Sequence, residues 1–214
     1  MSRKLTTRKL LPLLLLSASL GGALSACAPI IIGGAVMGSL MATDRRTAGT
    51  QIEDEGIELR ASSRISENLG DRAHVNVTSY NRQVLLTGEV PNAQDKQLVE
   101  QVVGRVANVR SIVNELAVLG HSTLTQRSSD VLVTGKVKAG LVDAKDLFAN
   151  AFKVVTERGS TYLMGRVTQR EANRATDIAR ATGGVQKVVR VLEIISEDEL
   201  QTLLPKPAPV EVKK

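Results

Sequence analysis

Residues 84–90 read VLLTGEV, and residues 161–167 read TYLMGRV. Both are apolar runs with a glycine at the same place, Gly88 in one and Gly165 in the other, and each follows a residue pair typical of a turn. Both also precede a polar–apolar run with helical spacing. A repeat of this length indicates one supersecondary unit used twice.

The same order of elements is predicted around each copy. In the first, Thr50 and Glu53 form a capping-box candidate for a helix over 51–69. The apolar alternation at Val75 and Val77 predicts a strand that pairs with 84–90 as a hairpin. A helix then opens after Asn92, with an apolar stripe at Leu98, Val99, Val102, Val103 and Val106, and a last strand covers 109–118.

The second copy restarts at Asp130, the expected N-cap of a helix that carries residues 131–141. Phe152 and Val154 take the places of Val75 and Val77. A helix over 169–181 and a closing strand over 185–195 complete the unit. The fold class is therefore α+β: two tandem αββαβ domains, each with a three-stranded sheet covered by two helices. With two Tyr, two Phe and no Trp, the cores must be small and aliphatic.

The N-terminus has the pattern of a secretory signal over residues 1–26, with a basic start and a Leu-rich core that is too short to span a membrane. The stretch LSAC at 24–27 resembles the lipobox of bacterial lipoproteins, and Cys27 is the only cysteine. This resemblance implies cleavage before Cys27 and its lipidation; an ordinary signal peptide with an incidental cysteine is the alternative. Ala28, rather than Asp, follows the cysteine, which by the same analogy implies the outer membrane, facing the periplasm.

The remaining segments are expected to connect the domains or to lack a fold. Residues 27–45 form a lipidated tether, whose apolar, glycine-containing part is read as flexible rather than as a segment lying on lipid. The first domain covers 46–119, a polar linker 120–129 and the second domain 130–195. Residues 196–214 are expected to form a disordered Pro-rich tail.

Charge is placed unevenly along the chain. The net charge of +6 includes four basic residues of the signal. Residues 45–120 contain 9 basic and 10 acidic side chains, whereas residues 127–195 contain 12 basic and 7 acidic ones. The second copy is therefore the one expected to attract an anionic partner.

These features together resemble BON domains, small modules of bacterial periplasmic and outer-membrane proteins. The residues that carry the resemblance are the lipobox, DRRTAGTQ at 44–51, NVT at 76–78, VLLTG at 84–88, PNA at 91–93, VNE at 113–115, KV at 136–137 and LMGRVTQREA at 163–172. The resemblance implies a lipoprotein that is not an enzyme. It implies binding of anionic phospholipids, phosphatidylglycerol and cardiolipin, through the first helix of the second domain, support of outer-membrane integrity, and a place at division sites.

In that helix, Val133, Val137, Gly140 and Leu141 share one face and are expected to be core. A different face carries the expected phospholipid-binding residues Leu132, Gly135, Lys136 and Ala139, with Lys138 near its other edge. An apolar side chain flanked by lysines suits a membrane surface, because lysine stems lie along acyl chains while their ammonium groups meet phosphate. The alternative is that Leu132 packs against the first domain and the lysines are solvated.

Other functions have weaker support. A periplasmic adaptor that binds outer-membrane protein assembly machinery, through the same surface or a groove between the domains, is the main alternative. Nucleic-acid binding lacks stacking aromatics. No nucleophile-elbow or phosphate-loop spacing points to an enzyme or a cofactor. His74 and His121 are expected at the surface, with no Cys, Asp or second His placed to complete a metal site. The basic run Arg166, Arg170, Arg174 and Arg180 is interpreted as a solvated face, with an extension of the lipid surface as the alternative.

Overall fold

The computed structural model describes residues 44–203. The expected signal peptide, Cys27, most of the tether and the tail from residue 204 lie outside the described residues. In chain order the main elements are α3 (Ala48–Leu69), β1 (His74–Tyr80), β2 (Gln83–Val90), α4 (Ala93–Gly104), β3 (Ser111–Asn114), β4 (Ala117–Val118), α5 (Leu124–Asp143), β5 (Phe152–Glu157), β6 (Ser160–Thr168), α6 (Gln169–Ala181), β7 (Lys187–Ile195) and α7 (Glu197–Leu203).

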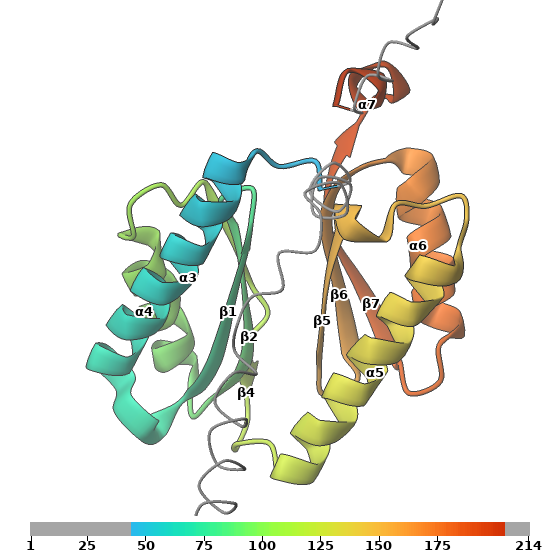
Figure 1. Cartoon of the computed structure of the whole chain (residues 1–214). Coiled ribbons are helices and arrows are strands. Elements are labelled where there is room, and N and C mark those ends of the chain that lie inside the picture. The colour runs from blue at the N-terminus through green and yellow to red at the C-terminus, as the bar shows by residue number, and fades with distance from the viewer. Residues whose placement is uncertain (1–43, 204–214) are drawn as a thin grey trace, which may run out of the picture. The chain divides into compact units, whose positions relative to one another are not determined.

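Each copy of the repeat folds into the predicted αββαβ unit. The first sheet has the order β1-β2-β3, with β4 also paired to β2, and the second has the order β5-β6-β7. The hairpins β1–β2 and β5–β6 are antiparallel, whereas β3, β4 and β7 pair in parallel with the central strand. Figure 1 shows α3 and α4 on one face of the first sheet, and α5 and α6 on one face of the second. The α+β prediction is confirmed.

Several element boundaries differ from the prediction. Helix α3 is capped by Thr47, whose Oγ1 accepts the Thr50 N–H at 3.1 Å, so the capping box expected at Thr50 and Glu53 is wrong. The closing strand of the first domain is interrupted between β3 and β4, where Leu116 turns into the core and is 2% exposed. Residues 197–203 form α7, although this part of the tail was expected to be disordered.

The two strands that carry the repeat, β2 and β6, are buried along almost their whole length. In β2, alternate residues Val84, Leu86 and Val90 join the core under α3 and α4, while Leu85 points to the opposite face. A strand covered on both faces reads as a continuous apolar run rather than an alternating one. This explains the composition of residues 84–90.

The glycine of each repeat sits where the facing backbone comes too close for a side chain. A Cβ on Gly88 would overlap the His74 carbonyl oxygen, and one on Gly165 would overlap the Ala151 carbonyl oxygen. Gly88 also has a φ of 111°, which side chains disfavour. The glycines therefore permit the tight hairpin pairing in both domains.

A buried aspartate on the first helix of each domain holds the hairpin turn of that domain. Asp54 accepts the backbone N–H groups of Asn81 at 2.8 Å and Arg82 at 2.7 Å. Both turn residues have positive φ, as a two-residue type I′ turn requires. Burial alone would raise the pKa of Asp54, but hydrogen bonds from Ser79, from these amides and from Arg46 outweigh it, so the pKa is lowered.

Asp130 plays the same part in the second domain. It accepts the N–H groups of Arg158 at 2.8 Å and Gly159 at 2.9 Å, and both residues again have positive φ. Asp130 lies inside α5 and is 8% exposed. The prediction that Asp130 is the N-cap of this helix is therefore wrong.

Each domain has its own aliphatic core between its helices and its sheet. The predicted stripe of α4 lies in the first core, with Val99 and Val103 fully buried, and Ala172, Ala175 and Ala179 of α6 are fully buried in the second. Val133, Val137 and Leu141 of α5 are at most 5% exposed, as predicted for the core face. The described residues contain no helix that is both long and apolar enough to cross a membrane.

A third apolar cluster joins the two sheets. It consists of Tyr80 and Leu85 from the first domain and Tyr162, Met164 and Val191 from the second. These side chains lie on the sheet faces opposite the helices, so each sheet is covered by helices on one side and by the other sheet's residues on the other. Polar contacts surround the cluster, including Lys153 Nζ to Glu58 at 2.6 Å.

A buried ion pair ties the start of the described chain to the second domain. Arg45 donates two hydrogen bonds to Glu171, at 2.7 and 2.8 Å, and a third to the Arg166 carbonyl oxygen at 2.8 Å. The side chains of the pair are 3% and 1% exposed. The next residue, Arg46, contacts the first domain instead: it pairs with Asp54 at 2.8 Å and lies over the Tyr80 ring. Residues 44–46 thus contact both domains.

Candidate functional site

The first helix of the second domain, α5, is longer than predicted. Its N-cap is Thr123, and Gln126 completes a capping box with it. Residues 124–129 therefore belong to the helix, although the sequence placed them in a linker. The additional turns bring Leu124 onto the same helix as the expected phospholipid-binding residues.

All five expected binding residues of α5, which are Leu132, Gly135, Lys136, Lys138 and Ala139, are exposed. Leu132 is 66% exposed, so the alternative in which it packs against the first domain is wrong. Three further apolar residues of α5 are exposed and were missed as site residues: Leu124 at 80%, Val131 at 70% and Val142 at 70%. We call Leu124, Val131, Leu132 and Val142 the outer stripe.

The outer stripe has a regular helical spacing. With a turn every 3.6 residues, positions 124, 131 and 142 fall almost in one line, and Gly135 lies on the same line. Leu132 lies to one side of this line, next to Ala139. In the sequence, apolar residues spaced seven apart (Leu124 to Val131) and eleven apart (Val131 to Val142) indicate this line. Leu124, however, fell in the predicted linker.

Two lysines flank the outer stripe. Lys136 and Lys138 lie on opposite sides of it and are both exposed. Within residues 44–203, neither lysine forms a hydrogen bond or an ion pair. Their ammonium groups are therefore available to an anionic ligand.

The basic run of the second domain does not add to this surface. Arg166 pairs with Glu193 at 3.2 Å and with Glu199 at 2.7 Å. Arg174 lies 3.3 Å from Asp146, and Arg170 lies 3.8 Å from Glu197. Acidic neighbours therefore balance three of the four arginines, and only Arg180 has no such partner among the described residues.

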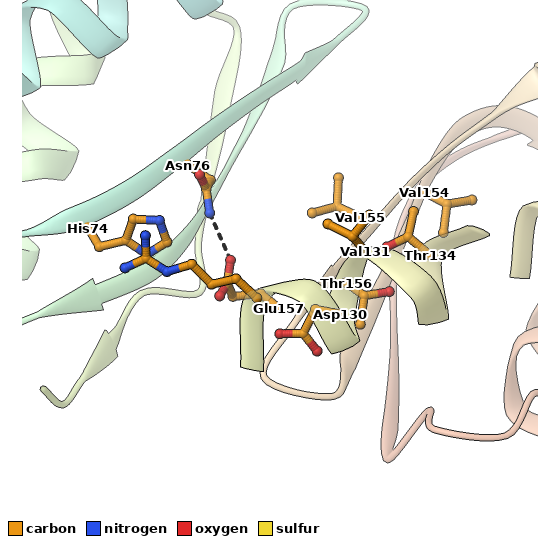
Figure 2. A pocket seen from close by; sticks show the side chains of 10 residues that line it. His74, Asn76, Asp130, Val131, Thr134, Val154, Val155, Thr156 and Glu157 are labelled. Carbon is orange, nitrogen blue, oxygen red and sulfur yellow. Dashed lines mark hydrogen bonds between the residues drawn. The ribbon is translucent and has the colours of Figure 1, made fainter. Parts of the chain in front are cut away.

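A second group of polar side chains lies where β1 and β2 approach β5. His74 Nδ1 lies 2.9 Å from Glu89 Oε2, and the two residues face each other in the β1–β2 register. Glu157, the last residue of β5, accepts a hydrogen bond from Asn76 at 2.8 Å. Figure 2 shows His74, Asn76 and Glu157 beside the pocket that also contains Asp130. His74 is half-buried, with 20% of its side chain exposed, so it lies only partly at the surface.

The acids of this group differ in protonation behaviour. Glu89 is fully buried, which alone would raise its pKa, but hydrogen bonds from His74, from Ser122 and from Arg158 outweigh burial, and the pKa is lowered. For Glu157, burial raises the pKa, and the negative charges of Glu89 and Asp130 add to this effect. Negative charge is thus less well compensated at Glu157 than at Glu89.

His74, Glu89 and Glu157 also offer ligand atoms for a metal ion. One atom from each lies within 4.8 Å of the other two. No Cys, Asp or second His in the sequence pointed to a partner for His74, because both neighbours are glutamates and Glu157 belongs to the other domain. His121 is exposed, with Nε2 3.2 Å from the Arg72 carbonyl oxygen.

Comparison with known proteins shows the family. The BON domain model matches residues 53–120 and again residues 129–196. The chain is 37% identical over 174 residues to outer membrane lipoprotein DolP of Haemophilus influenzae, covering 80% of this chain and 90% of that protein. It is 32% identical over 154 residues to the 21 kDa hemolysin of Actinobacillus pleuropneumoniae, covering 71% of this chain and 79% of the relative.

A solved structure of CdsD, described as a structural protein of the type III secretion system of Chlamydia trachomatis, is 14% identical and covers 74% of this chain and 99% of its own. Its TM-score of 0.26 is too low to support an argument about fold or function. The family models and the relatives, by contrast, span both αββαβ units. The chain therefore belongs to the BON-domain family and carries two BON domains in tandem.

Proposed function

We propose that this chain is an outer-membrane lipoprotein, anchored through Cys27 and facing the periplasm, that binds anionic phospholipid through α5. It acts as a binding protein rather than as an enzyme, and supports outer-membrane integrity at division sites. The similarity to outer membrane lipoprotein DolP supports the location. The observation that supports the binding role is the exposed outer stripe, flanked by two lysines without partners among the described residues.

The energies suit a contact that is weak alone and effective on an anchored protein. Burying one Leu or Val side chain in an apolar environment contributes about 1.5–3 kcal/mol when burial is complete. A lysine near an anionic membrane surface adds about 1 kcal/mol. The lipid anchor would hold α5 close to the bilayer, so the contact between α5 and phospholipid would form at a high effective concentration.

The test compares two exposed leucines on equivalent helices. Leu132 lies between lysines on α5, whereas Leu59 is 73% exposed on α3 beside Glu55 and Glu58. The protein is the mature chain with Cys27→Ser, so that lipidation does not mask the contact. It is titrated with vesicles of phosphatidylglycerol and phosphatidylcholine and, separately, of phosphatidylcholine alone.

Leu132→Glu is expected to weaken binding to the anionic vesicles by about 10- to 100-fold, because it removes an apolar contact of about 1.5–3 kcal/mol and adds a repelled charge. Leu59→Glu should leave binding unchanged, and neutral vesicles should bind the parent chain weakly. NMR shifts should fall within residues 124–142. Equal effects of the two variants, or no shifts in α5, would exclude the lipid role of this helix.

The adaptor alternative makes a different prediction. The apolar cluster that contains Tyr80 and Met164 fills part of the space between the two sheets, so a partner that binds there would be limited to the pocket lined by His74 and Glu157. If an outer-membrane assembly partner uses the outer stripe, Leu132→Glu abolishes its capture. If capture persists while lipid binding is lost, the lipid role and the partner role belong to different surfaces.

A further inference from the structure

The pair His74 and Glu89 is held in place by the β1–β2 hairpin. The two residues are direct cross-strand partners on the sheet face that points away from α3 and α4. Gly88, next to Glu89, allows the strands to approach closely at this point. The backbone register thus sets the 2.9 Å separation between His74 Nδ1 and Glu89 Oε2.

The third member comes from the second domain. Glu157 ends β5, immediately before the turn that Asp130 holds. Its carboxylate lies near both His74 and Glu89, with one oxygen of each acid and one ring nitrogen of His74 within 4.8 Å of one another. A ligand held by all three side chains would therefore contact both BON domains.

We propose that His74, Glu89 and Glu157 together bind a divalent transition-metal ion, Zn²⁺ rather than Ca²⁺, and that the ion links the first domain to the second. One imidazole nitrogen and two carboxylate oxygens are donors that Zn²⁺ accepts, whereas Ca²⁺ takes only oxygen donors and needs more of them. Ligand atoms in a tetrahedral zinc site lie roughly 3.3 Å apart, since each bond is about 2.0–2.2 Å long. The His74–Glu89 separation is already close to this spacing.

Of the two Glu89 oxygens, Oε2 is the one that faces His74 and would bind the ion. Arg158 contacts Oε1 of Glu89 at 3.3 Å, while His74 and Ser122 contact Oε2. An ion bound to Oε2 replaces the proton between that oxygen and the imidazole, and Arg158 remains on Oε1. Asn76 fixes Glu157 by a 2.8 Å hydrogen bond, as outer groups commonly orient metal ligands.

The charges around the three proposed ligands and the pocket beside them suit a metal ion that binds reversibly. The ligand atoms of Glu89 and Glu157 lie within 4.8 Å of each other, so a cation between the two carboxylates would reduce their mutual repulsion. Arg158 opposes the cation and limits its affinity. A pocket of about 340 Å³, lined by His74 and Glu157 among others, gives room for a water molecule as the fourth ligand.

The experiment uses the mature chain with Cys27→Ser, which also removes the only thiol that would compete for zinc. Zn²⁺ and Ca²⁺ are titrated separately into metal-free protein by calorimetry, and thermal unfolding is recorded with and without each ion. The variants are His74→Gln and Glu157→Gln, which keep hydrogen-bonding side chains. His121→Ala, at the other histidine, is the matched control.

One Zn²⁺ is expected to bind per chain and to raise Tm, whereas Ca²⁺ should do neither. His74→Gln and Glu157→Gln should each weaken zinc binding by about tenfold or more, because each removes a ligand. Glu157→Gln can keep the hydrogen bond from Asn76, so it should leave the Tm of the metal-free protein nearly unchanged, yet lose the zinc-dependent increase. This combination separates loss of a ligand from loss of folding.

Two results would overturn the proposal. The first is the absence of heat and of any Tm change at millimolar Zn²⁺. The second is zinc binding that survives in both glutamine variants but disappears in His121→Ala, which would place the ion at the exposed histidine. Lipid binding by α5 is measured separately, so either outcome leaves the proposed function intact.

Discussion

Replacing Arg45 with alanine is expected to destabilise the protein substantially, although the residue precedes the first helix. Its guanidinium is 3% exposed and gives two hydrogen bonds to Glu171 and one to the Arg166 carbonyl. Removing one member of a buried ion pair typically costs about 3–5 kcal/mol, because the other charge stays buried. In the variant, Glu171 would still accept the hydrogen bond from the Thr168 N–H (2.9 Å) and would still lie at the N-terminus of α6, where a negative charge is favoured. We therefore expect the free energy of unfolding to fall by about 3 kcal/mol, at the lower end of this range.

The measurement is urea unfolding of the mature chain, followed by circular dichroism, with thermal unfolding alongside. For a chain of this size, 3 kcal/mol corresponds to a Tm decrease of about 6–12 °C. Glu171→Gln should lower the free energy of unfolding by a similar amount, because Arg45 then stays buried without its counter-charge. The double variant Arg45→Met with Glu171→Gln should lose less than the sum of the two single losses. A loss below about 1 kcal/mol in Arg45→Ala would show that the buried pair does not stabilise the fold.

Three further outcomes test the fold. Gly165→Ala should lower the free energy of unfolding by about 2 kcal/mol or more, because its Cβ would overlap the Ala151 carbonyl oxygen; a change within about 0.5 kcal/mol in urea unfolding would contradict this. Asp54→Ala should cost about 2–4 kcal/mol by the same assay, since it leaves the buried amides of the β1–β2 turn without an acceptor, and hydrogen exchange should be faster in that turn if the reasoning holds. Asp54, Glu89 and Glu171 all have lowered pKa values, so the stability that they contribute is present above their ordinary pKa of about 4 and is lost as pH falls through the folded values; urea unfolding that is no easier at about pH 3 than at pH 6 would refute this.

The elements with strong local signals were predictable from sequence. Helix α6 has the predicted bounds, because Thr168 caps it through the Glu171 amide and its alanines are spaced along one buried face. The hairpins follow from turn residues that accept positive φ and from apolar runs on both sides. In these cases the residues that decide the structure lie within a few positions of each other.

The start of α5 was not predictable in the same way. This helix carries apolar residues on its buried face and on its outer stripe, so no clear polar side marks its period. Thr123 and Gln126 form a capping box, but mostly polar residues follow them, whereas a capping box is recognised in sequence by an apolar run after it. Asp130 resembled an N-cap by residue type, whereas its actual role depends on a turn 28 residues away.

The contacts between the domains had no local signal at all. His74, Glu89 and Glu157 come together only after two sheets pack, and the hydrogen bond between Asn76 and Glu157 spans 81 residues. Similarly, Arg45 reads as one of two adjacent surface arginines, yet it is buried against α6. Side chains that pair across such distances depend on tertiary packing, which neither composition nor periodicity describes.

The packing of sheet against sheet limits how many copies this architecture accepts. Each BON domain buries one sheet face beneath its own helices and the other against its neighbour, through Tyr80, Leu85, Tyr162, Met164 and Val191. A third domain added to the chain would find no free sheet face to pack on, unlike a solenoid, in which every added unit leaves a new surface for the next. The tandem is therefore a closed pair, and either domain produced alone would expose an apolar face that belongs to its partner.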